Sequence, residues 1–492
     1  MSSNFYVACE LGEDCGRVWL GTLHKEGLTV SEVRRFQIDP VVEKKSVHWS
    51  VPQICEEILG ALRGVAAHEE PVASISCHSW AADSLLFAPD GSLITPVYHH
   101  RDTRTESGME ATLARVPWEE VYAETGVQPT HVNTLFQLAT EKPRRLDRAG
   151  HFLPLADAFN FLLGGDPRSE RSLASMTQLF NPTTGAWSEG LIKKLKLAPK
   201  IFPGVVPAGT KLGKMRPEIA GETGLADTRV MASCSHEIAA GLAGIPAEPG
   251  ESWAFLRLGN AAVIGTELPE PLINDATRQM NMTNQPGAAG TVAFYKHAAG
   301  LWILDECKRY WKQRERDLDD SVLRHLAVSA PAFESLIDFA DPRFFTPGDM
   351  PLKIQQYCEE TRQEIPRKPG PVLRCILESL ALHFRNAIAE IELLTGKRFS
   401  RLYLLNSPAN SLLPPFTANA LQLPVVVLPP EAAAIGNVLV QAVGQGHLRS
   451  LEAARLVARQ SFRREIISPH TAVWNAASER LEEVKLQKEE TE

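Results

Sequence analysis

Two segments of the chain carry side chains suited to binding a polyhydroxylated small molecule. Trp80 and Asp83 follow directly after an apolar run, and residues 99–105 read HHRDTRT. An aromatic face, a carboxylate that accepts bonds from two hydroxyl groups and an Arg101–Asp102 pair are what a polyol site requires. The alternative is a surface hairpin with ordinary ion pairs, which the spacing alone favours slightly. Adjacent histidines without acidic or cysteine partners at ligand spacing do not indicate a metal site.

The hydrophobic pattern predicts the elements that must position these side chains. Strands and one helix are expected in the first quarter of the chain, at residues 5–11, 17–23 and 28–36, then 51–66 (the helix) and 72–77. Trp80 and Asp83 then stand just beyond the carboxyl end of a strand, where α/β folds bind ligands. Antiparallel strands followed by strand–helix alternation indicate an α/β domain with a mixed sheet.

The pattern restarts after residues 241–252 (GLAGIPAEPGES), whose glycine and proline content predicts a domain boundary. A long helix is expected at residues 371–395, with Pro371 in its first turn and Gly396 at its C-terminal cap. The remaining expected elements are strands at 254–258, 262–265, 402–405 and 425–428, and helices that begin at 410 and 431. The last ~45 residues are expected to be helical and frayed at the end.

This organisation predicts two α/β lobes with a cleft between them, each beginning with a hairpin. The expected domains are residues 1–246, residues 247–446 and a helical tail at 447–492.

Composition narrows the class of protein. The chain has 492 residues, 44% hydrophobic and 22% charged, as in a globular protein of two or three domains. Its 51 basic and 59 acidic residues give a net charge of −8, which disfavours a nucleic-acid partner or DNA-binding regulator. No apolar run approaches the ~20 residues of a membrane helix, and no basic leader is visible. Eight scattered cysteines indicate reduced thiols, so we expect a cytoplasmic protein without a membrane partner.

Several motifs together resemble the FGGY carbohydrate kinases, in particular the rhamnulokinase branch. Residues 76–105 are similar to the family's Gly-Ile-Asp-x-Trp-Gly-Val-Asp … Tyr-Arg-Asp-Ser-Arg-Thr pattern. Further similar stretches are 124–137 (ETGVQPTHVNTLFQ), 169–178 (SERSLASMTQ), 282–291 (MTNQPGAAGT) and 300–306 (GLWILDE). The resemblance runs to residue 445. It implies two actin-like, ribonuclease-H-like ATPase lobes that close on sugar and ATP.

The resemblance also implies a reaction and roles for individual residues. The reaction is transfer of the ATP γ-phosphate, with Mg²⁺, to a hydroxyl group of a small ketose, which in the rhamnulokinase branch is the 1-hydroxyl group of L-rhamnulose. Glu237 stands at the position of the catalytic base and Glu10 at that of the metal-holding carboxylate. The sugar-binding positions are Trp80, Asp83, Arg101, Asp102, Asn133 and His236. The nucleotide-binding positions are Gly12, Arg17, Gly259, Asn260, Asn410 and Gly436.

The first phosphate hairpin and the base position depart from the family pattern. Residues 10–17 read ELGEDCGR, with Glu10 in place of aspartate and with Glu13 and Asp14 where hydroxyl residues usually face phosphate. Two like charges ~5 Å apart repel by about 3 kcal/mol at an effective dielectric constant of ~20, unless a cation compensates them. Residues 235–239 read SHEIA. Ser235 is expected to cap a helix whose first turn carries Glu237, a longer base than the family's aspartate.

The second half departs as well. Residues 257–262 (RLGNAA) keep Gly259 but lack the hydroxyl residues of the second phosphate hairpin. Residues 405–410 (LNSPAN) replace the three glycines that let nucleotide approach the backbone, and Pro408 has no N–H. Residues 430–437 (PEAAAIGN) match well. On the sugar side the one departure is His78, which replaces an aspartate.

Two hypotheses of function remain open from the sequence. The first is an active sugar kinase with an unusual ATP site, which the resemblance favours. The second is a catalytically impaired relative that binds a sugar as a sensor or regulatory partner, which the four changes on the ATP side favour. The sequence does not distinguish a monomer from a homodimer.

Overall fold

The computed structural model describes residues 3–12, 15–44, 46–66, 71–314, 318–408, 411–471 and 473–489. The chain forms two compact units. Unit 1 comprises residues 1–249, 267–294 and 431–462, and unit 2 comprises residues 250–266, 295–430 and 463–492. This division differs from the sequence-based boundaries, because residues 431–462 return to unit 1 after the chain has built most of unit 2.

Unit 1 is built on a six-stranded sheet in the order β14-β15-β6-β1-β2-β3. Its strands are β1 (Asn4–Leu11), β2 (Cys15–His24), β3 (Gly27–Gln37), β6 (Val72–Ser79), β14 (Thr210–Lys214) and β15 (Arg229–Ala232). Strands β1, β2 and β3 form an antiparallel meander, whereas β6 runs parallel to both β1 and β15. The mixed sheet expected from the sequence is therefore present.

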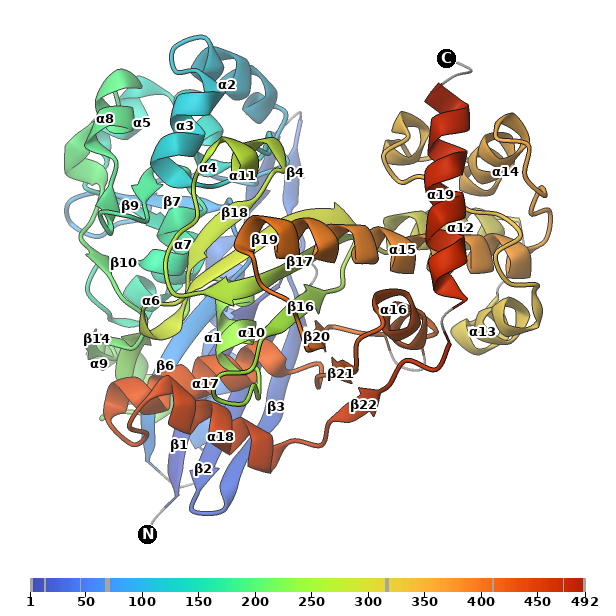
Figure 1. Ribbon diagram of the computed structural model, residues 1–492. Coiled ribbons are helices and arrows are strands. Elements are labelled where there is room, and N and C mark those ends of the chain that lie inside the picture. The colour runs from blue at the N-terminus through green and yellow to red at the C-terminus, as the bar shows by residue number, and fades with distance from the viewer. Residues whose placement is uncertain are drawn as a thin grey trace. The chain divides into compact units, whose positions relative to one another are not determined.

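Helices cover both faces of this sheet (Figure 1). Side chains alternate along β1, so Tyr6 and Ala8 pack with Val438 of α17 (Ala432–Gln445), and α18 (Leu451–Ser461) joins the same cluster. On the other face, Val7 and Cys9 belong to a core with α1 (Val51–Ala66) and α6 (Leu155–Leu163). The N-terminal strands and helices from near the C-terminus thus share one core.

The rest of unit 1 carries shorter elements. Its strands are β4 (Val41–Glu43), β5 (Ser46–Trp49), β7 (Ser84–Phe87), β8 (Val97–Tyr98), β9 (His151–Pro154), β10 (Ser169–Glu170), β11 (Phe180–Asn181), β12 (Ala186–Trp187), β13 (Val205–Val206) and β18 (Thr283–Pro286). Its helices are α2 (Arg104–Leu113), α3 (Trp118–Thr125), α4 (Thr134–Ala139), α5 (Pro143–Arg148), α7 (Arg171–Ser175), α8 (Glu189–Lys194), α9 (Pro217–Thr223), α10 (Glu237–Ala243) and α11 (Asp275–Gln279).

Unit 2 repeats the strand arrangement of unit 1. Its strands are β16 (Trp253–Arg257), β17 (Ala261–Leu268), β19 (Val292–Ala299), β20 (Arg401–Leu405), β21 (Val425–Val427) and β22 (Glu465–Ile467), in the order β19-β17-β16-β20-β21-β22. An antiparallel hairpin, β16 and β17, is followed by the parallel strands β20 and β21, as in β1, β2, β6 and β15. Its helices are α12 (Trp302–Lys312), α13 (Asp320–Ser329), α14 (Met350–Glu360), α15 (Pro369–Thr395), α16 (Leu413–Leu421) and α19 (Trp474–Glu489).

Most expected elements are confirmed within a few residues, and one expectation is wrong in detail. Helix α15 begins at Pro369, two residues earlier than expected, so Pro371 still lies in its first turn, and Gly396 caps the helix in the left-handed conformation as expected. The C-terminal segment is not helical throughout, because β22 pairs with β21 between α18 and α19. The expected start of a helix at residue 410 lies outside the described residues, and α16 begins at Leu413.

All eight cysteines are free thiols. Among the helices of the described residues, none is both long and apolar enough to cross a membrane.

Candidate active site

The hairpin between β1 and β2 holds the first group of predicted residues. Glu10 pairs with Arg17 across the two strands, and its carboxylate lies 3.6 Å from the Arg17 guanidinium. Trp19 Nε1 donates a 2.8 Å hydrogen bond to Glu10 Oε2. Gly12 donates a backbone bond to Cys15, and a Cβ at Gly12 would lie 2.9 Å from the Cys15 oxygen. A side chain at position 12 would therefore clash with the backbone of Cys15. Glu13 and Asp14 lie outside the described residues.

Glu237 lies at the start of α10, in its first turn as expected. The helix-capping position belongs to His236, so the expectation that Ser235 caps this helix is wrong. The Ser235 hydroxyl instead donates a 2.7 Å bond to Asp157. An isolated bridge between Ser79 and His236 joins the end of β6 to the beginning of α10, so Glu237 lies beside the carboxyl end of the central strands.

A buried pair of carboxylic acids supports the loop before α10, and sequence reasoning missed it. Glu170 Oε2 accepts backbone bonds of 3.0 Å from Ser172 and 2.9 Å from Ser235, and the Glu170 amide donates to Asp157. Burial raises the pKa of Glu170 to about 7 and that of Asp157 well above its ordinary range. The pair fixes the entry to the Glu237 helix. The sequence feature that points to this pair is Glu170, an acidic residue inside the 169–178 motif.

Trp80 and Asp83 form a compact buried cluster after β6. Trp80 Nε1 donates to Asp83 Oδ2 at 2.5 Å, and His100 Nδ1 lies 2.7 Å from the same oxygen. A carboxylate only accepts, so the His100 proton is on Nδ1. Asp83 Oδ1 is buried and has no hydrogen-bond partner in the described part of the chain. His99 stacks on His100 at a ring distance of 4.3 Å, and burial lowers the pKa of His99 to about 4.

The backbone of this turn is held in an unusual conformation. Ala82 has a φ of 82°, in the left-handed region that non-glycine residues seldom occupy. Its carbonyl oxygen accepts bonds from Thr134 Oγ1 at 2.8 Å and Gln137 Nε2 at 2.9 Å, both on α4. Helix α4 therefore fixes the direction in which Asp83 points.

Two other predicted sugar-binding side chains, those of Asp102 and Asn133, are engaged with the protein itself. Asp102 accepts bonds from Ser46 Oγ and the Val47 amide on Oδ2, and from the Arg104 amide on Oδ1. Asn133 Oδ1 accepts the Thr130 amide at 2.7 Å. These contacts position loops, which is a structural role for both residues.

His236 is buried, and its Nδ1 contacts Gln285 Nε2, within the 282–291 motif. Arg101 is exposed at the surface of unit 1.

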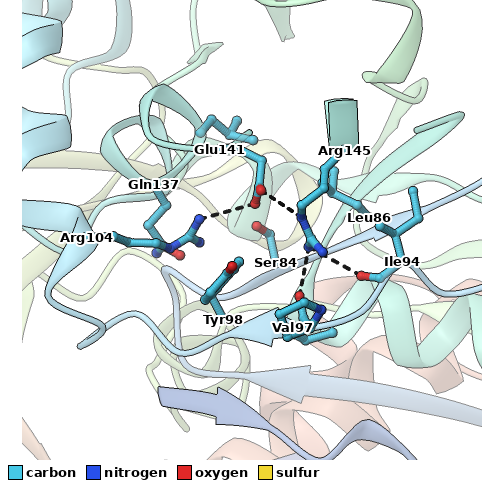
Figure 2. A pocket seen from close by; sticks show the side chains of 11 residues that line it. Ser84, Leu86, Ile94, Val97, Tyr98, Arg104, Gln137, Glu141 and Arg145 are labelled. Atoms are coloured by element: carbon cyan, nitrogen blue, oxygen red, sulfur yellow. Dashed lines mark hydrogen bonds and ion pairs between the residues drawn. The ribbon is translucent and has the colours of Figure 1, made fainter. Parts of the chain in front are cut away.

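A second polar cluster lies next to residues 99–102 and holds this segment in place (Figure 2). The Glu141 carboxylate accepts hydrogen bonds from Arg104 at 3.2 Å and from Arg145 at 2.7 Å. Arg104 also stacks over the Tyr98 ring at 3.8 Å, and Arg145 donates to the Pro96 carbonyl at 2.8 Å. The remaining space is about 20 Å³, enough for about one water molecule. These contacts fix the position of the loop at residues 99–102.

Gly436, a predicted nucleotide-binding residue, has a packing role in unit 1. It lies in α17 where this helix crosses α10, and a Cβ there would clash with the carbonyl oxygen of Ala240. The neighbouring Asn437 reaches the end of β6 and lies 3.0 Å from His78 Nδ1. Close helix packing thus explains the match of residues 430–437 to the family pattern.

Unit 2 contains the other predicted nucleotide-binding residues. Gly259 and Asn260 form the turn between β16 and β17, and their carbonyl oxygens accept bonds from the amides of Leu301 and Trp302. Asn410 lies outside the described residues. Asn406, where the family has glycine, has a φ of 55° and so keeps a conformation that glycine would allow.

A cavity of about 480 Å³ opens beside this loop in unit 2. Apolar side chains, including Leu304 and Leu377, line it together with the charged side chains of Asp305 and Lys308. Pro408 and Leu412, on either side of the 409–410 segment, also line it. Apolar walls with a few polar groups fit a planar base such as that of a nucleotide.

The described residues contain no group of three metal-ligating side chains. Such a group is not required for Mg²⁺, which is usually held by one or two carboxylates together with substrate phosphates. Glu10 fits this pattern, because its carboxylate is one-fifth exposed and, among the described residues, the 3.6 Å ion pair with Arg17 is the contact of Oε1.

Comparisons with known proteins identify the family. Residues 14–244 match the N-terminal domain, and residues 254–444 the C-terminal domain, of the FGGY family of carbohydrate kinases. The chain is 33% identical over 482 residues to the rhamnulokinase of Bacteroides thetaiotaomicron, covering 97% of this chain and 98% of that one. It is 31% identical over 465 residues to the rhamnulokinase of Enterococcus faecalis, covering 94% and 93%. The chain belongs to the FGGY family, in its rhamnulokinase-like branch.

Solved structures agree on the fold. The xylulose kinase of Lactobacillus acidophilus superimposes with a TM-score of 0.81 at 13% identity, covering 99% of this chain and 97% of that one. The glycerol kinase of Plasmodium falciparum with ADP gives 0.77 at 13% identity, covering 97% and 98%. The expected fold of two actin-like, ribonuclease-H-like lobes is confirmed. The protein is therefore a member of a family of sugar kinases, which are phosphotransferases that use ATP.

Proposed function

We propose that the protein is an ATP-dependent kinase that phosphorylates a hydroxyl group of L-rhamnulose or a closely similar ketose. The observation that carries this proposal is the Trp80–Asp83–His100 cluster. It offers an aromatic wall and a buried carboxylate oxygen, Asp83 Oδ1, without a partner in the described residues. A hydroxyl group of a sugar is the donor that such an oxygen accepts. The names of the two relatives above support L-rhamnulose among ketoses.

Glu237 is the proposed base for the reacting hydroxyl group. It is half-buried at a helix N-terminus, where the helix dipole favours a negative charge. Its carboxylate would accept the proton of the hydroxyl group as the sugar oxygen bonds to the γ-phosphorus of ATP and the bond from that phosphorus to the oxygen of the leaving ADP breaks. Glu170 and Asp157 hold Ser235, two residues before Glu237, and so fix the start of the helix that carries it.

ATP supplies the phosphoryl group in this reaction, and Mg²⁺ neutralises phosphate charge. The cavity beside Pro408 and Leu412 is the proposed binding site of the adenine ring of ATP. Glu10 is the carboxylate proposed to bind Mg²⁺, and Gly12 and Arg17 are proposed to contact the phosphates. We place the protein in the cytoplasm, in keeping with its eight free thiols, and propose no further partner.

A second candidate is a catalytically impaired homologue that binds the sugar as a sensor. The specific observation in its favour is the turn at Gly259 and Asn260, which offers no side-chain hydroxyl to phosphate and whose carbonyls bond to Leu301 and Trp302.

The test is ADP release from ATP·Mg²⁺ with L-rhamnulose, D-xylulose, L-ribulose and glycerol, with Glu237→Gln as the matched inactive variant. Turnover with L-rhamnulose that exceeds the other three and disappears in the variant is expected. Calorimetric binding of L-rhamnulose without any turnover would instead establish the sensor. Binding of none of the four compounds would refute both candidates.

A further inference from the structure

His78 is a buried residue with one ring nitrogen unused. Its exposed fraction is 0%, and within the described residues Nε2 has no hydrogen-bond partner. A buried polar atom without a hydrogen bond costs free energy. A ligand that supplies the missing bond offsets this cost. The FGGY pattern described above has an aspartate at this position, which His78 replaces.

The hydrogen-bond network behind the ring determines which nitrogen carries the proton. The Ser74 hydroxyl donates to Gln441 Oε1 at 2.7 Å, so the Gln441 amide nitrogen faces Asn437 and donates to its Oδ1 at 2.7 Å. Asn437 therefore turns its Nδ2 toward His78 Nδ1, 3.0 Å away, and Nδ1 must accept. The proton of the neutral imidazole is then on Nε2, which makes Nε2 a donor.

The backbone places His78 beside the two segments that carry the proposed catalytic carboxylates. His78 lies opposite Glu10 in the parallel pairing of β6 with β1. The next residue, Ser79, bridges to His236, which directly precedes Glu237.

We propose that His78 is a phosphate-binding residue whose Nε2–H donates to an oxygen of the sugar's phosphoryl group. This inference rests on the proposed function for the roles of Glu10 and Glu237. A phosphoryl group near Glu10 and Glu237 is repelled by both carboxylates. The aspartate of the family pattern would add a third repulsion at position 78, and a neutral imidazole there removes it. His78 thereby compensates in part for the acidic residues that distinguish this chain's phosphate hairpin.

The test compares binding of L-rhamnulose and L-rhamnulose 1-phosphate by calorimetry in the absence of nucleotide. His78→Asn keeps a partner for Asn437 but loses the Nε2 donor, whereas His78→Gln keeps an N–H near that position. We expect the preference for the phosphorylated sugar to fall tenfold or more in H78N, about the worth of one bond to a charged group. H78Q should retain it within about threefold.

His447→Asn is the matched control, because His447 also uses Nδ1, toward the Tyr6 hydroxyl, but lies outside the site. It should leave the preference unchanged, and affinity for the free sugar should be unchanged in all three variants. If H78N does not fold, wild-type protein labelled with ¹⁵N-histidine provides the second measurement. The Nε2–H resonance of His78 should shift on addition of the 1-phosphate and not of L-rhamnulose.

An unchanged preference in H78N, or an unmoved resonance, overturns the role of His78 and leaves the proposed kinase intact if the wild type shows turnover. A lost preference in a protein without turnover supports His78 and refutes the kinase. Binding of neither compound by the wild type refutes both.

Discussion

Replacing Asp83 with asparagine tests the sugar site most directly. Asp83 is 1% exposed, and its two oxygens differ in use: Oδ2 accepts from Trp80 and His100, whereas Oδ1 has no partner in the described chain. A hydrogen bond to a charged acceptor is worth about 1.5–3 kcal/mol. If a sugar hydroxyl donates to Oδ1, Asp83→Asn should weaken binding of L-rhamnulose by about 10- to 100-fold. The amide oxygen can still accept from Trp80 and His100, so the free energy of unfolding should fall by only about 1–2 kcal/mol.

Isothermal titration with L-rhamnulose and thermal unfolding together provide the assay. Asp102→Asn is the contrasting variant, because both oxygens of Asp102 are bonded to Ser46, Val47 and Arg104. It should lower the melting temperature while changing the dissociation constant for the sugar by less than about threefold. If D83N binds L-rhamnulose within twofold of the wild type, or if D102N shows the larger loss of binding, the assignment of Asp83 is refuted.

Three further predictions concern residues around the Glu237 helix. Glu237→Gln should reduce kcat for ADP release by about 100-fold or more, the usual worth of a general base, with the sugar dissociation constant unchanged; residual activity above a tenth would contradict the role. Folding raises the pKa of Glu170 from 4.5 to about 7, so this group's contribution to the free energy of unfolding is full below about pH 4.5 and is lost as pH rises toward 7. Glu170→Gln should therefore gain stability relative to the wild type between pH 5 and pH 8, by up to about 3 kcal/mol in urea unfolding; a constant difference would refute the raised pKa. Gly436→Ala should cost about 3 kcal/mol or more through the clash with Ala240, against about 1 kcal/mol for Gly446→Ala, which has a φ of 84° and open space; equal losses would exclude the packing role.

The amino-acid sequence by itself determined the elements and the family. Alternation and helical spacing are local properties, so the start and end of α1 and the C-terminal cap of α15 at Gly396 follow from neighbouring residues alone. The placement of Trp80 and Asp83 after a strand was readable for the same reason. The motifs that resemble FGGY kinases are also short contiguous stretches, so they indicate the family without any tertiary contact.

The tertiary structure decided what each of these side chains touches. Asp102 bonds to β5, Gly436 packs on α10, and Ser235 bonds to Asp157 and not to its own helix. The unused Nε2 of His78 depends on Asn437, more than 350 residues further along the chain. A carboxylate or glycine looks the same in a sequence whether it meets a ligand or another part of the protein. The choice is made by contacts between distant segments, because only folding brings a side chain and its partner within hydrogen-bonding distance.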